Sequence, residues 1–278
     1  MTDLTTQTVH STATPPISAV VIANDVYPTL PTLLESLREL DEVVVYENNC
    51  IPGLLEDICQ RFPNVAYHRG EFIGFGPTHN AAVRLAKHDW IFSIDTDESA
   101  SEPLMHELRQ LDLSNPRQAF MVLRNNFFTG RHIKWGGWGN DWLVRLYHRR
   151  TARFNDAEVH ELVETSPEVE VKNLKGPIFH RAVTDIDSFL HKISDYSELR
   201  RQASKKSYHP FVIVLKAKWA FFRSYVLQLG FMSGWRGLVI AWSIANGVFY
   251  KYIKIHSDKR MRKTVSRLPA SNRQQSER

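Results

Sequence analysis

The first hundred residues alternate short β-rich runs with longer amphipathic stretches. The runs "ISAVVIA" (17–23), "EVVVYE" (42–47), "VAYHR" (65–69) and "WIFSID" (90–95) have the length and residue types of strands. Between them, "TLPTLLESLREL", "PGLLEDICQRF" and "PTHNAAVRLAKH" resemble helices. Strands and helices alternating at this spacing predict right-handed βαβ units, and therefore an α/β fold with a mostly parallel sheet and helices on both faces.

The last third of the chain has a different pattern, in which single cations interrupt strongly apolar blocks. The longest uncharged block, Gly237–Tyr250, has fourteen residues, which is short of the roughly 20 that span a bilayer. The pattern predicts two amphipathic helices, broken near Ser233 and Gly234, that lie in a membrane interface. Tryptophans at headgroup depth would be Trp219, Trp235 and Trp242. Helices that cap the core or form a dimer interface are the alternative.

Charge is distributed unevenly along the 278 residues. The net charge is +5, but residues 199–278 hold seventeen Lys or Arg and only two acids, so the first 198 residues carry −10. A polybasic segment suits nucleic acid or an anionic membrane surface, and the apolar residues between these cations favour the membrane and not nucleic acid. Two cysteines, Cys50 and Cys59, provide no disulfide framework and suit a reducing cytosol.

Polar residues follow the predicted strands at the edge where α/β sheets bind ligands. They are Asn24 and Asp25, then Glu47, Asn48 and Asn49, then Asp95, Asp97 and Glu98. Two carboxylates separated by one residue after a buried strand can hold Mg²⁺ or Mn²⁺ together with substrate phosphates, although such pairs also occur on solvated turns. The segment "GFGPTH" lacks the third glycine of a dinucleotide fingerprint, and no P-loop occurs, so nicotinamide, flavin and ordinary ATP chemistry are disfavoured.

A second candidate segment is "GGWGNDWLVRLYHR". If "DWLVRLY" is a strand, Asp141, Leu143 and Arg145 share one face. Three tryptophans beside glycines could form a platform on which a sugar stacks, or could be core anchors. These are Trp135, Trp138 and Trp142.

These motifs, in this order, resemble glycosyltransferase family 2, and within it the bacterial lipopolysaccharide core β-1,4-glucosyltransferases. The resemblance covers roughly residues 17–255, and it is carried by "ISAVVIANDVYPTLPTLLESL", "EVVVYENN", "GFGPTHNAAVRLAKHDWIFSIDTDE", "GGWGNDWLVRLYHRRTARFNDAEVHELVE" and "GFMSGWRGL". It implies a GT-A-type, Rossmann-like sheet flanked by helices, with a C-terminal amphipathic helical extension.

The resemblance also assigns roles to individual residues. Asp95 and Asp97 match the family's Asp-x-Asp, which holds the cation on the donor diphosphate, and His160 is a further candidate ligand. Asp141 matches the general base, with Arg145 positioning it or touching phosphate. The residues expected to contact the nucleotide sugar are Ala23, Asn24, Asp25, Glu47, Asn49, Gly76, Asn80, Asp95 and Thr96.

Two departures from the family pattern stand out. Glu47 occupies the position of an aspartate that faces the nucleotide base, so that "YENNC" replaces the usual "VDSGS". His79-Asn80 replaces an Arg-Asn pair, which weakens a phosphate-facing cation at that position.

The implied reaction is metal-dependent and inverting. A hexose, expected to be glucose, moves from a UDP-sugar to a hydroxyl of a membrane-linked glycan such as lipopolysaccharide core. The expected partners are the nucleotide sugar, a glycolipid or surface-polysaccharide acceptor, and an anionic membrane surface. A sugar-phosphate nucleotidyltransferase is one alternative, but "ANDVYPT" lacks the expected glycine-rich signature. A non-catalytic membrane-surface scaffold is the other.

The expected organisation has four parts. Residues 1–16 form a disordered tail without the basic and apolar regions of a secretory signal, and residues 17–184 form the GT-A catalytic domain. Residues 185–256 form the helical, membrane-associating extension, and 257–278 a basic, disordered tail. The expected location is therefore cytoplasmic, peripheral on the cytoplasmic face of the inner membrane.

Overall fold

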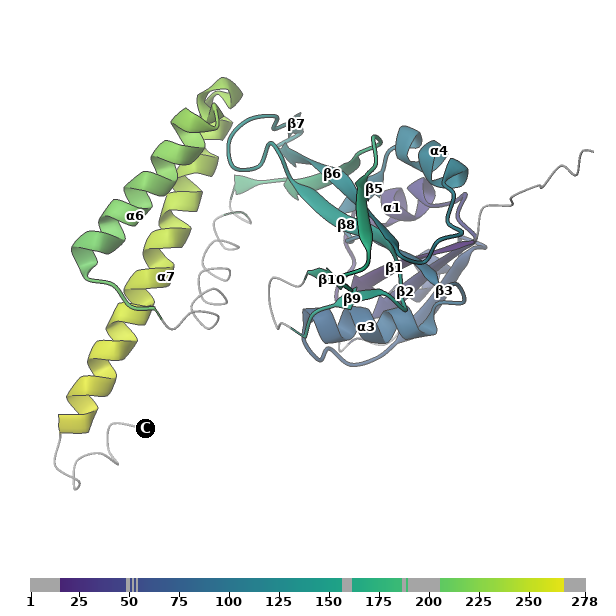
Figure 1. Ribbon diagram of the computed structural model, residues 1–278, viewed down its shortest axis with the longest axis horizontal. Helices are drawn as coiled ribbons and strands as arrows, with labels where there is room; N and C mark the ends of the chain where they lie inside the picture. The colour runs from purple at the N-terminus through teal and green to yellow at the C-terminus, as the bar shows by residue number, and fades with distance from the viewer. Residues whose placement is uncertain are drawn as a thin grey trace, which may run out of the picture. The chain divides into compact units, whose positions relative to one another are not determined.

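The computed structural model describes residues 16–48, 51, 53, 55–156, 162–186, 189 and 206–267, with side chains described as far as residue 261. The chain forms two compact units, whose helices and strands are labelled in Figure 1. The first unit comprises Met1–Arg124 and Trp142–Phe179. The second comprises Asn125–Asp141 and His180–Arg278.

The first unit is built on a sheet whose first four strands are parallel. They are β1 (Ile17–Ala23), β2 (Glu42–Glu47), β3 (Val65–Arg69) and β4 (Trp90–Ser93), in the order β3-β2-β1-β4. All four predicted strands are therefore confirmed, the last one ending two residues early. Beyond β4 the direction reverses, because β8 (Trp142–His148) pairs antiparallel with β4 and with β6 (Gln118–Phe128).

Shorter strands complete the sheet. The order continues from β8 and β6 through β12 (Ile178–Val183) to β5 (Glu98–Ala100), while β11 (Glu170–Asn173) and β7 (Arg131–His132) pair with β6. A separate hairpin joins β9 (Ala152–Phe154) to β10 (Val163–Thr165). The result is a mixed α/β fold with a mostly parallel central sheet, as predicted.

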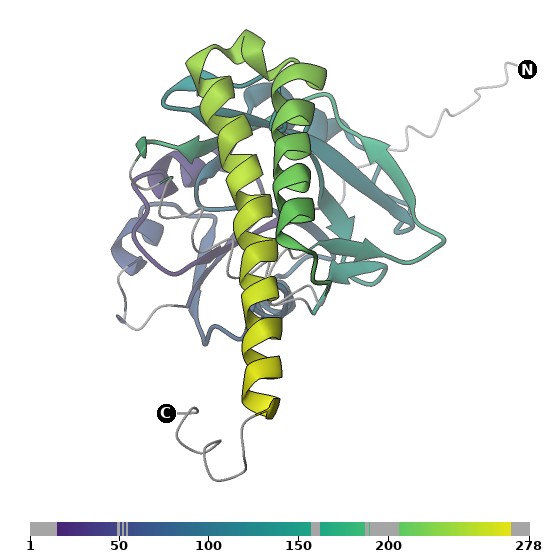
Figure 2. The ribbon, with the colours of Figure 1, turned by 90° about the vertical axis from the view of Figure 1, so that its left-hand side faces the viewer.

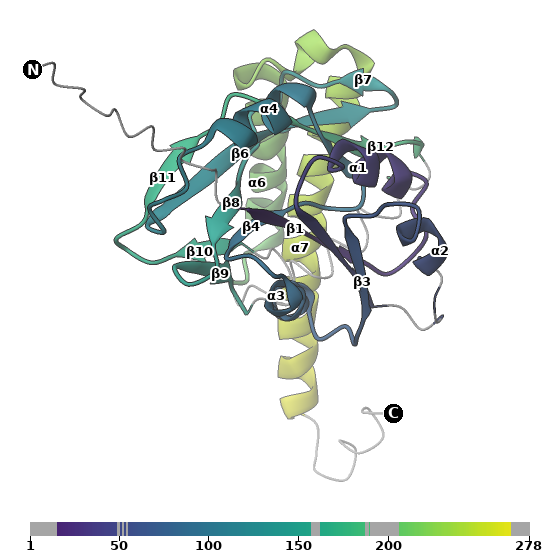
Figure 3. The ribbon, with the colours of Figure 1, turned by 90° about the vertical axis from the view of Figure 1, so that its right-hand side faces the viewer.

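Helices of the first unit cover both faces of the sheet. One face carries α1 (Leu30–Ser36) and α4 (Glu102–Gln110), the other carries α3 (Phe75–Leu85), and the short α2 (Glu56–Cys59) contacts β3 (Figure 3). The alternation along β1 explains this arrangement. Ala19 and Val21 join the core cluster of α1 and α4, whereas Val20 joins the cluster of α3. Both faces are apolar, which is typical of parallel strands.

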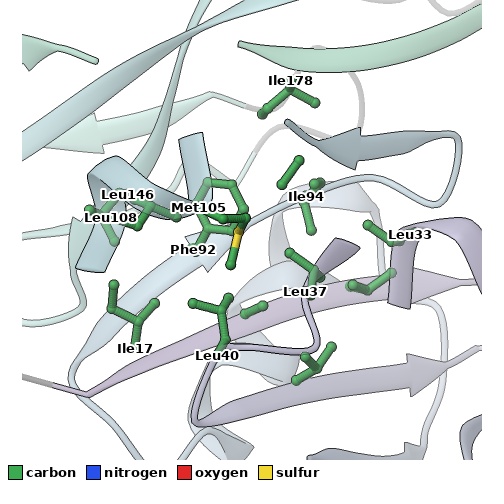
Figure 4. Close-up of a cluster of buried hydrophobic side chains, with 14 of the residues drawn as sticks. Ile17, Leu33, Leu37, Leu40, Phe92, Ile94, Met105, Leu108, Leu146 and Ile178 are labelled. Atoms are coloured by element: carbon green, nitrogen blue, oxygen red, sulfur yellow. The ribbon is translucent and has the colours of Figure 1, made fainter. Parts of the chain in front are cut away.

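The larger core cluster lies between the sheet and the pair α1 and α4. Figure 4 shows Phe92 of β4 in this cluster with Met105 and Leu108 of α4. Its members from α1 include Leu33 and Leu34, which are fully buried. This burial supplies most of the driving force that holds β4 in place, and β4 leads directly to Asp95.

Strand β8 contains a bulge at Arg145. Leu146 pairs with Phe120 of β6, but Val144 pairs with the next residue, Met121, so Arg145 is an extra residue. The bulge shifts the alternation of side chains, because Leu146 joins the cluster of α1 and α4 whereas Val144 packs against the cluster of α3. A bulge re-aims the side chain of the extra residue.

The second unit contains a helical hairpin. Helices α6 (Pro210–Phe222) and α7 (Trp235–Arg267) run side by side, joined by a π-helical turn, η1 (Arg223–Leu227), and a 3₁₀ turn, η2 (Gly230–Ser233) (Figure 2). The predicted pair of helices, and the break near Gly234, are therefore confirmed. Within the described part of the chain, no helix is both long enough and apolar enough to cross a bilayer.

The strand end and loops of the second unit pack against this hairpin. Arg236 of α7 donates hydrogen bonds to the Phe128 carbonyl and the Thr129 hydroxyl, both at 3.0 Å. The Gly136 N–H donates to the Gln228 carbonyl at 2.8 Å. These hydrogen bonds, which involve both backbone and side-chain groups, fasten the segment 125–141 to the hairpin.

A buried carboxylate ties together the amino ends of β1 and β2. Glu42 accepts hydrogen bonds from the Ser18 hydroxyl (2.6 Å) and the Lys87 N–H (2.7 Å). Burial alone would raise the pKa of Glu42, but these hydrogen bonds and the Lys87 charge hold it below its usual 4.5.

We predict that Glu42→Gln lowers the free energy of unfolding by about 1–2 kcal/mol at neutral pH, because a charge-assisted hydrogen bond becomes a neutral one. A carboxylate with a depressed pKa stabilises the fold above its unfolded-state pKa, and loses that contribution as the pH falls through the folded value. Urea titrations from pH 7 to pH 3 should show the difference between variant and wild type shrinking below pH 4.5. A constant difference at every pH would contradict this assignment.

Candidate active site

The predicted polar edge of the sheet exists in the first unit. Asn24 and Asp25 follow β1 and are exposed, and Asp95 and Thr96 follow β4. The two loops are linked directly, because the Thr29 hydroxyl donates a hydrogen bond of 2.7 Å to the Thr96 carbonyl. The sheet therefore brings these predicted residues to one edge.

Arg145 organises the acidic turn at this edge. Its Nη2 lies 2.7 Å from Asp95 Oδ2, and 2.7 and 2.8 Å from the two carboxylate oxygens of Glu98. Arg124 adds a 3.3 Å contact to Glu98, and the Asp95 N–H donates to Glu98 at 3.0 Å. Two carboxylates and two guanidinium groups thus form a charge-balanced cluster.

Electrostatics keep this cluster ionised. Burial alone would raise the pKa of Asp95, but the charge and hydrogen bond of Arg145 hold it well below its usual range. Burial alone would lower the pKa of Arg145, and the carboxylates of Asp95 and Glu98 raise it instead. Asp95 and Arg145 are therefore both charged at neutral pH.

The acids of this turn differ in accessibility. The Glu98 side chain is inaccessible to solvent, whereas that of Asp95 is 36% exposed and Asp97 is half-buried. Glu98 therefore belongs to the scaffold. Asp95 and Asp97 are the carboxylates that a ligand could reach.

The donor set is chemically suited to a hard cation. No cluster of three or more candidate ligands occurs among the residues that the structure describes, and His160 lies outside them. Mg²⁺ and Mn²⁺ are commonly bound through one or two carboxylates plus substrate phosphates. Asp97 and the accessible part of Asp95 satisfy that requirement without a third protein ligand.

The sequence pattern suggests that Arg145 positions Asp141, and these two residues belong to different units. A strand with unbroken alternation would place Asp141, Leu143 and Arg145 on one face, but the bulge at Arg145 interrupts the alternation. The ion pairs of Arg145 go to Asp95 and Glu98. The shared face of Asp141, Leu143 and Arg145 therefore stays a prediction, and β8 itself begins only at Trp142.

Glu47 is buried at the carboxyl end of β2. Its Oε2 accepts hydrogen bonds from the Leu55 N–H (3.1 Å) and the Tyr67 hydroxyl (2.7 Å), and its Oε1 lies 3.6 Å from Arg69 Nε. Burial and the Glu47 hydrogen bond raise the pKa of Tyr67 to about 12, so this hydroxyl remains a donor. Glu47 thus anchors the start of α2. Asn49 lies outside the described residues.

Three of the residues expected to contact the nucleotide sugar are either buried or hydrogen-bonded within the protein. Ala23 is buried at the end of β1, and Gly76 is buried in the first turn of α3. The side-chain amide of Asn80 makes two hydrogen bonds to the Phe154 backbone. Its Nδ2 donates to the Phe154 carbonyl at 2.8 Å, and its Oδ1 accepts from the Phe154 N–H at 3.1 Å. Asn80 therefore fixes α3 to β9.

His79 supplies no positive charge. Its ring is buried and stacks on Phe154 with centroids 4.2 Å apart. Burial lowers the pKa of His79 to about 4, against an opposing effect of Asp95. The imidazole is neutral at physiological pH, in agreement with the weakened cation expected from the sequence.

In the second unit, Asp141 is held by a residue that the sequence did not single out. The side-chain amide of Asn126 donates to Asp141 Oδ2 at 3.2 Å and to the Trp138 carbonyl at 3.0 Å, and its Oδ1 lies 2.6 Å from His180 Nδ1. His180 thereby belongs to the same hydrogen-bond network as Asp141. The one available signal was the polar "RNN" inside the apolar strand β6.

The tryptophans near Asp141 do not share one role. Trp138 packs in an aromatic cluster with Phe128 and Phe189, so it is a core anchor. Trp135 is exposed and remains a candidate for sugar stacking, as does the half-buried Trp142.

Comparison with known proteins now identifies the family. The family model described as "Glycosyl transferase family 2" matches residues 18–166, more than half of the chain. This chain belongs to glycosyl transferase family 2. It is therefore a glycosyltransferase, and enzymes of this family use nucleotide-sugar donors.

Individual proteins resemble this glycosyltransferase more distantly. Uncharacterized glycosyltransferases of Rickettsia prowazekii and Rickettsia typhi are each 21% identical over 255 residues, which is 86% of this chain and 86% of the relative. The structure of S. aureus TarS 1-349 in complex with UDP-GlcNAc has a TM-score of 0.48 and 12% identity, covering 88% of this chain and 92% of TarS. Neither a nucleotidyltransferase nor a non-catalytic scaffold gains support from these comparisons.

We predict that Arg145→Met destabilises the glycosyltransferase by about 3–5 kcal/mol, because Glu98 would keep a buried charge without its closest partner. The double variant Arg145→Met with Glu98→Gln should regain part of this loss, since it buries no unpaired charge. Urea denaturation of the wild type, both single variants and the double variant measures the coupling. Strictly additive effects would show that the pair is not coupled.

Proposed function

We propose that this glycosyltransferase is a metal-dependent, inverting hexosyltransferase that moves glucose from a UDP-sugar to a hydroxyl of a membrane-linked glycan such as lipopolysaccharide core. The observation that carries the proposal is the turn after β4. Arg145 and Glu98 hold the accessible Asp95, and with it the backbone that leads to Asp97. Glucose, UDP and the acceptor come from the motif resemblance.

Donor binding would occur at the carboxyl edge of the first unit. The exposed Asn24 and Asp25, together with Thr96, line this edge and would contact the nucleotide sugar. Asp97 and Asp95 would hold Mg²⁺ or Mn²⁺, and His160 is a further proposed ligand. When bound, the cation supplies Lewis-acid neutralisation of the departing diphosphate.

The transfer is a displacement at the anomeric carbon. The acceptor oxygen forms a bond to this carbon on the face opposite the diphosphate, the bond from carbon to phosphate oxygen breaks, and its electron pair leaves with UDP. An acceptor hydroxyl is too weak an acid to ionise at neutral pH, so a general base must take its proton. Asp141 is the proposed base.

The helical hairpin would bring the enzyme to its acceptor. Exposed aromatic side chains lie on α6 and α7, including Trp219 (58% exposed) and Trp242 (60% exposed), and cations such as Lys218, Lys251 and Lys254 lie on the same helices. Apolar side chains of this size flanked by cations suit the interface of an anionic bilayer. We therefore propose peripheral binding at the cytoplasmic face of the inner membrane.

The donor proposal predicts a ligand-specific thermal shift. UDP with Mn²⁺ should raise the melting temperature by about 5 °C at a hundredfold excess over Kd, because the ligand binds only the folded state. Corresponding tests with ADP, GDP and CDP should show much smaller shifts. Asp97→Asn should lose the Mn²⁺-dependent part of the shift and the sugar-transfer activity.

Asp112→Asn is the matched control for this experiment, since Asp112 is an exposed aspartate in the loop after α4. It should behave like the wild type. A normal Mn²⁺-dependent shift and normal turnover in Asp97→Asn would refute the metal role.

The membrane proposal predicts binding to vesicles that contain phosphatidylglycerol. Replacing both Trp219 and Trp242 by Ser should weaken co-sedimentation by at least about tenfold, because two large apolar side chains no longer enter the interface. Phe72→Ser, which removes an exposed aromatic side chain of the first unit, should leave binding unchanged. Equal binding by the double variant and the wild type would exclude this surface.

A further inference from the structure

Asn126 is an unusual residue for its position. It lies on β6 in the second unit, is 3% exposed, and is followed two positions later by the fully buried Phe128. Burying an amide costs free energy unless its polar atoms are hydrogen-bonded. Asn126 meets this condition through three partners, and one of them is the proposed base.

The chemistry of these partners fixes the orientation of the amide. The Trp138 carbonyl and the Asp141 carboxylate only accept hydrogen bonds, so the NH₂ group of Asn126 must face them. Oδ1 then faces His180, at 2.6 Å from Nδ1. Because Oδ1 only accepts, His180 must carry a proton on Nδ1.

The three side chains therefore form a directed chain of hydrogen bonds from His180 through Asn126 to Asp141. It joins β12, β6 and the end of the loop after β7 within one unit. The donor that reaches the carboxylate is an amide, which does not titrate, so the contact persists across the working pH range. A hydrogen bond to an ionised acceptor is among the stronger kinds.

We propose that Asn126 is a positioning residue that orients the Asp141 carboxylate toward the acceptor hydroxyl, and that His180 locks Asn126 in the required orientation. This inference rests on the proposed role of Asp141 as the base. Asn126 is buried and bonded to Asp141, so in this proposal it acts through Asp141. A general base must lie within hydrogen-bond reach of the proton that it takes, so an unrestrained carboxylate would lose rate and not donor affinity.

The central experiment is a double-mutant cycle on Asn126 and Asp141, read as kcat and donor KM. Asn126→Ala should lower kcat by about 10- to 100-fold and leave the donor KM within threefold of the wild type. Asp141→Asn alone should lower kcat by about 10²- to 10⁴-fold, the range of a lost general base. In the Asp141→Asn background, Asn126→Ala should cost less than threefold more, because its effect passes through Asp141.

Asn125→Ala is the matched control. Asn125 is the neighbouring asparagine on β6 and projects to the other face of the strand. Its variant should keep kcat within threefold of the wild type.

A second pair of variants covers the case in which Asn126→Ala fails to fold. Asn can place an amide nitrogen close to the position of a histidine Nδ1, so His180→Asn keeps the donor, whereas His180→Leu removes it at similar volume. We expect His180→Asn to retain kcat within about threefold and His180→Leu to lower it about tenfold. The loss in His180→Leu should vanish in the Asp141→Asn background.

The results of these experiments distinguish a failure of the positioning role from a failure of the proposed function. Unchanged turnover in Asp141→Asn would refute the base assignment itself. If kcat falls in Asp141→Asn as expected, the positioning role is overturned by either of two results. One is a normal kcat in Asn126→Ala or His180→Leu. The other is a double variant whose loss of kcat equals the product of the losses in its two single variants.

Discussion

The structure depends most on the ion pair between Arg145 and the carboxylates of Glu98 and Asp95. Glu98 is inaccessible to solvent and Arg145 is almost so, and neither charge could stay buried without the other. The pair forms because β8 carries one residue too many opposite β6, and the bulge directs the extra side chain at the turn after β4. A local irregularity of the sheet thereby fixes the acidic turn on which the proposed donor site is built.

Much of the first unit could be predicted from the sequence. The apolar runs located β1 to β4 because a parallel strand buried on both faces leaves a continuous signal, and their order placed Asn24, Asp25 and Asp95 at one edge. The role of Glu98 could not be predicted, because the sequence does not distinguish a buried, structural acid from an accessible one in the same turn. Only the register between β6 and β8 reveals that Arg145 pairs with the buried Glu98 and with one oxygen of Asp95. Asp97 and the remaining part of Asp95 stay accessible.

In the second unit the helices could be predicted from the sequence, but the polar network could not. Its helices were predictable from the interrupted apolar blocks, yet its polar network was not, because Asn126 and His180 are 54 residues apart and meet only when β6 and β12 are in place. The same limit applies to Glu47 and Asn80. Both are predicted to contact the donor, and the structure adds a hydrogen bond from each to the backbone of its own unit, at Leu55 and Phe154 respectively. Residue type and position along a strand do not distinguish a ligand contact from a structural one.

The most direct test of the account is a crystal structure of the protein with UDP and Mn²⁺ bound. We expect Arg145 to keep its 2.7 Å contact with Glu98, and Asp97 to bind the cation together with the diphosphate. A structure in which Arg145 has left Glu98, and Glu98 binds the cation, would contradict it.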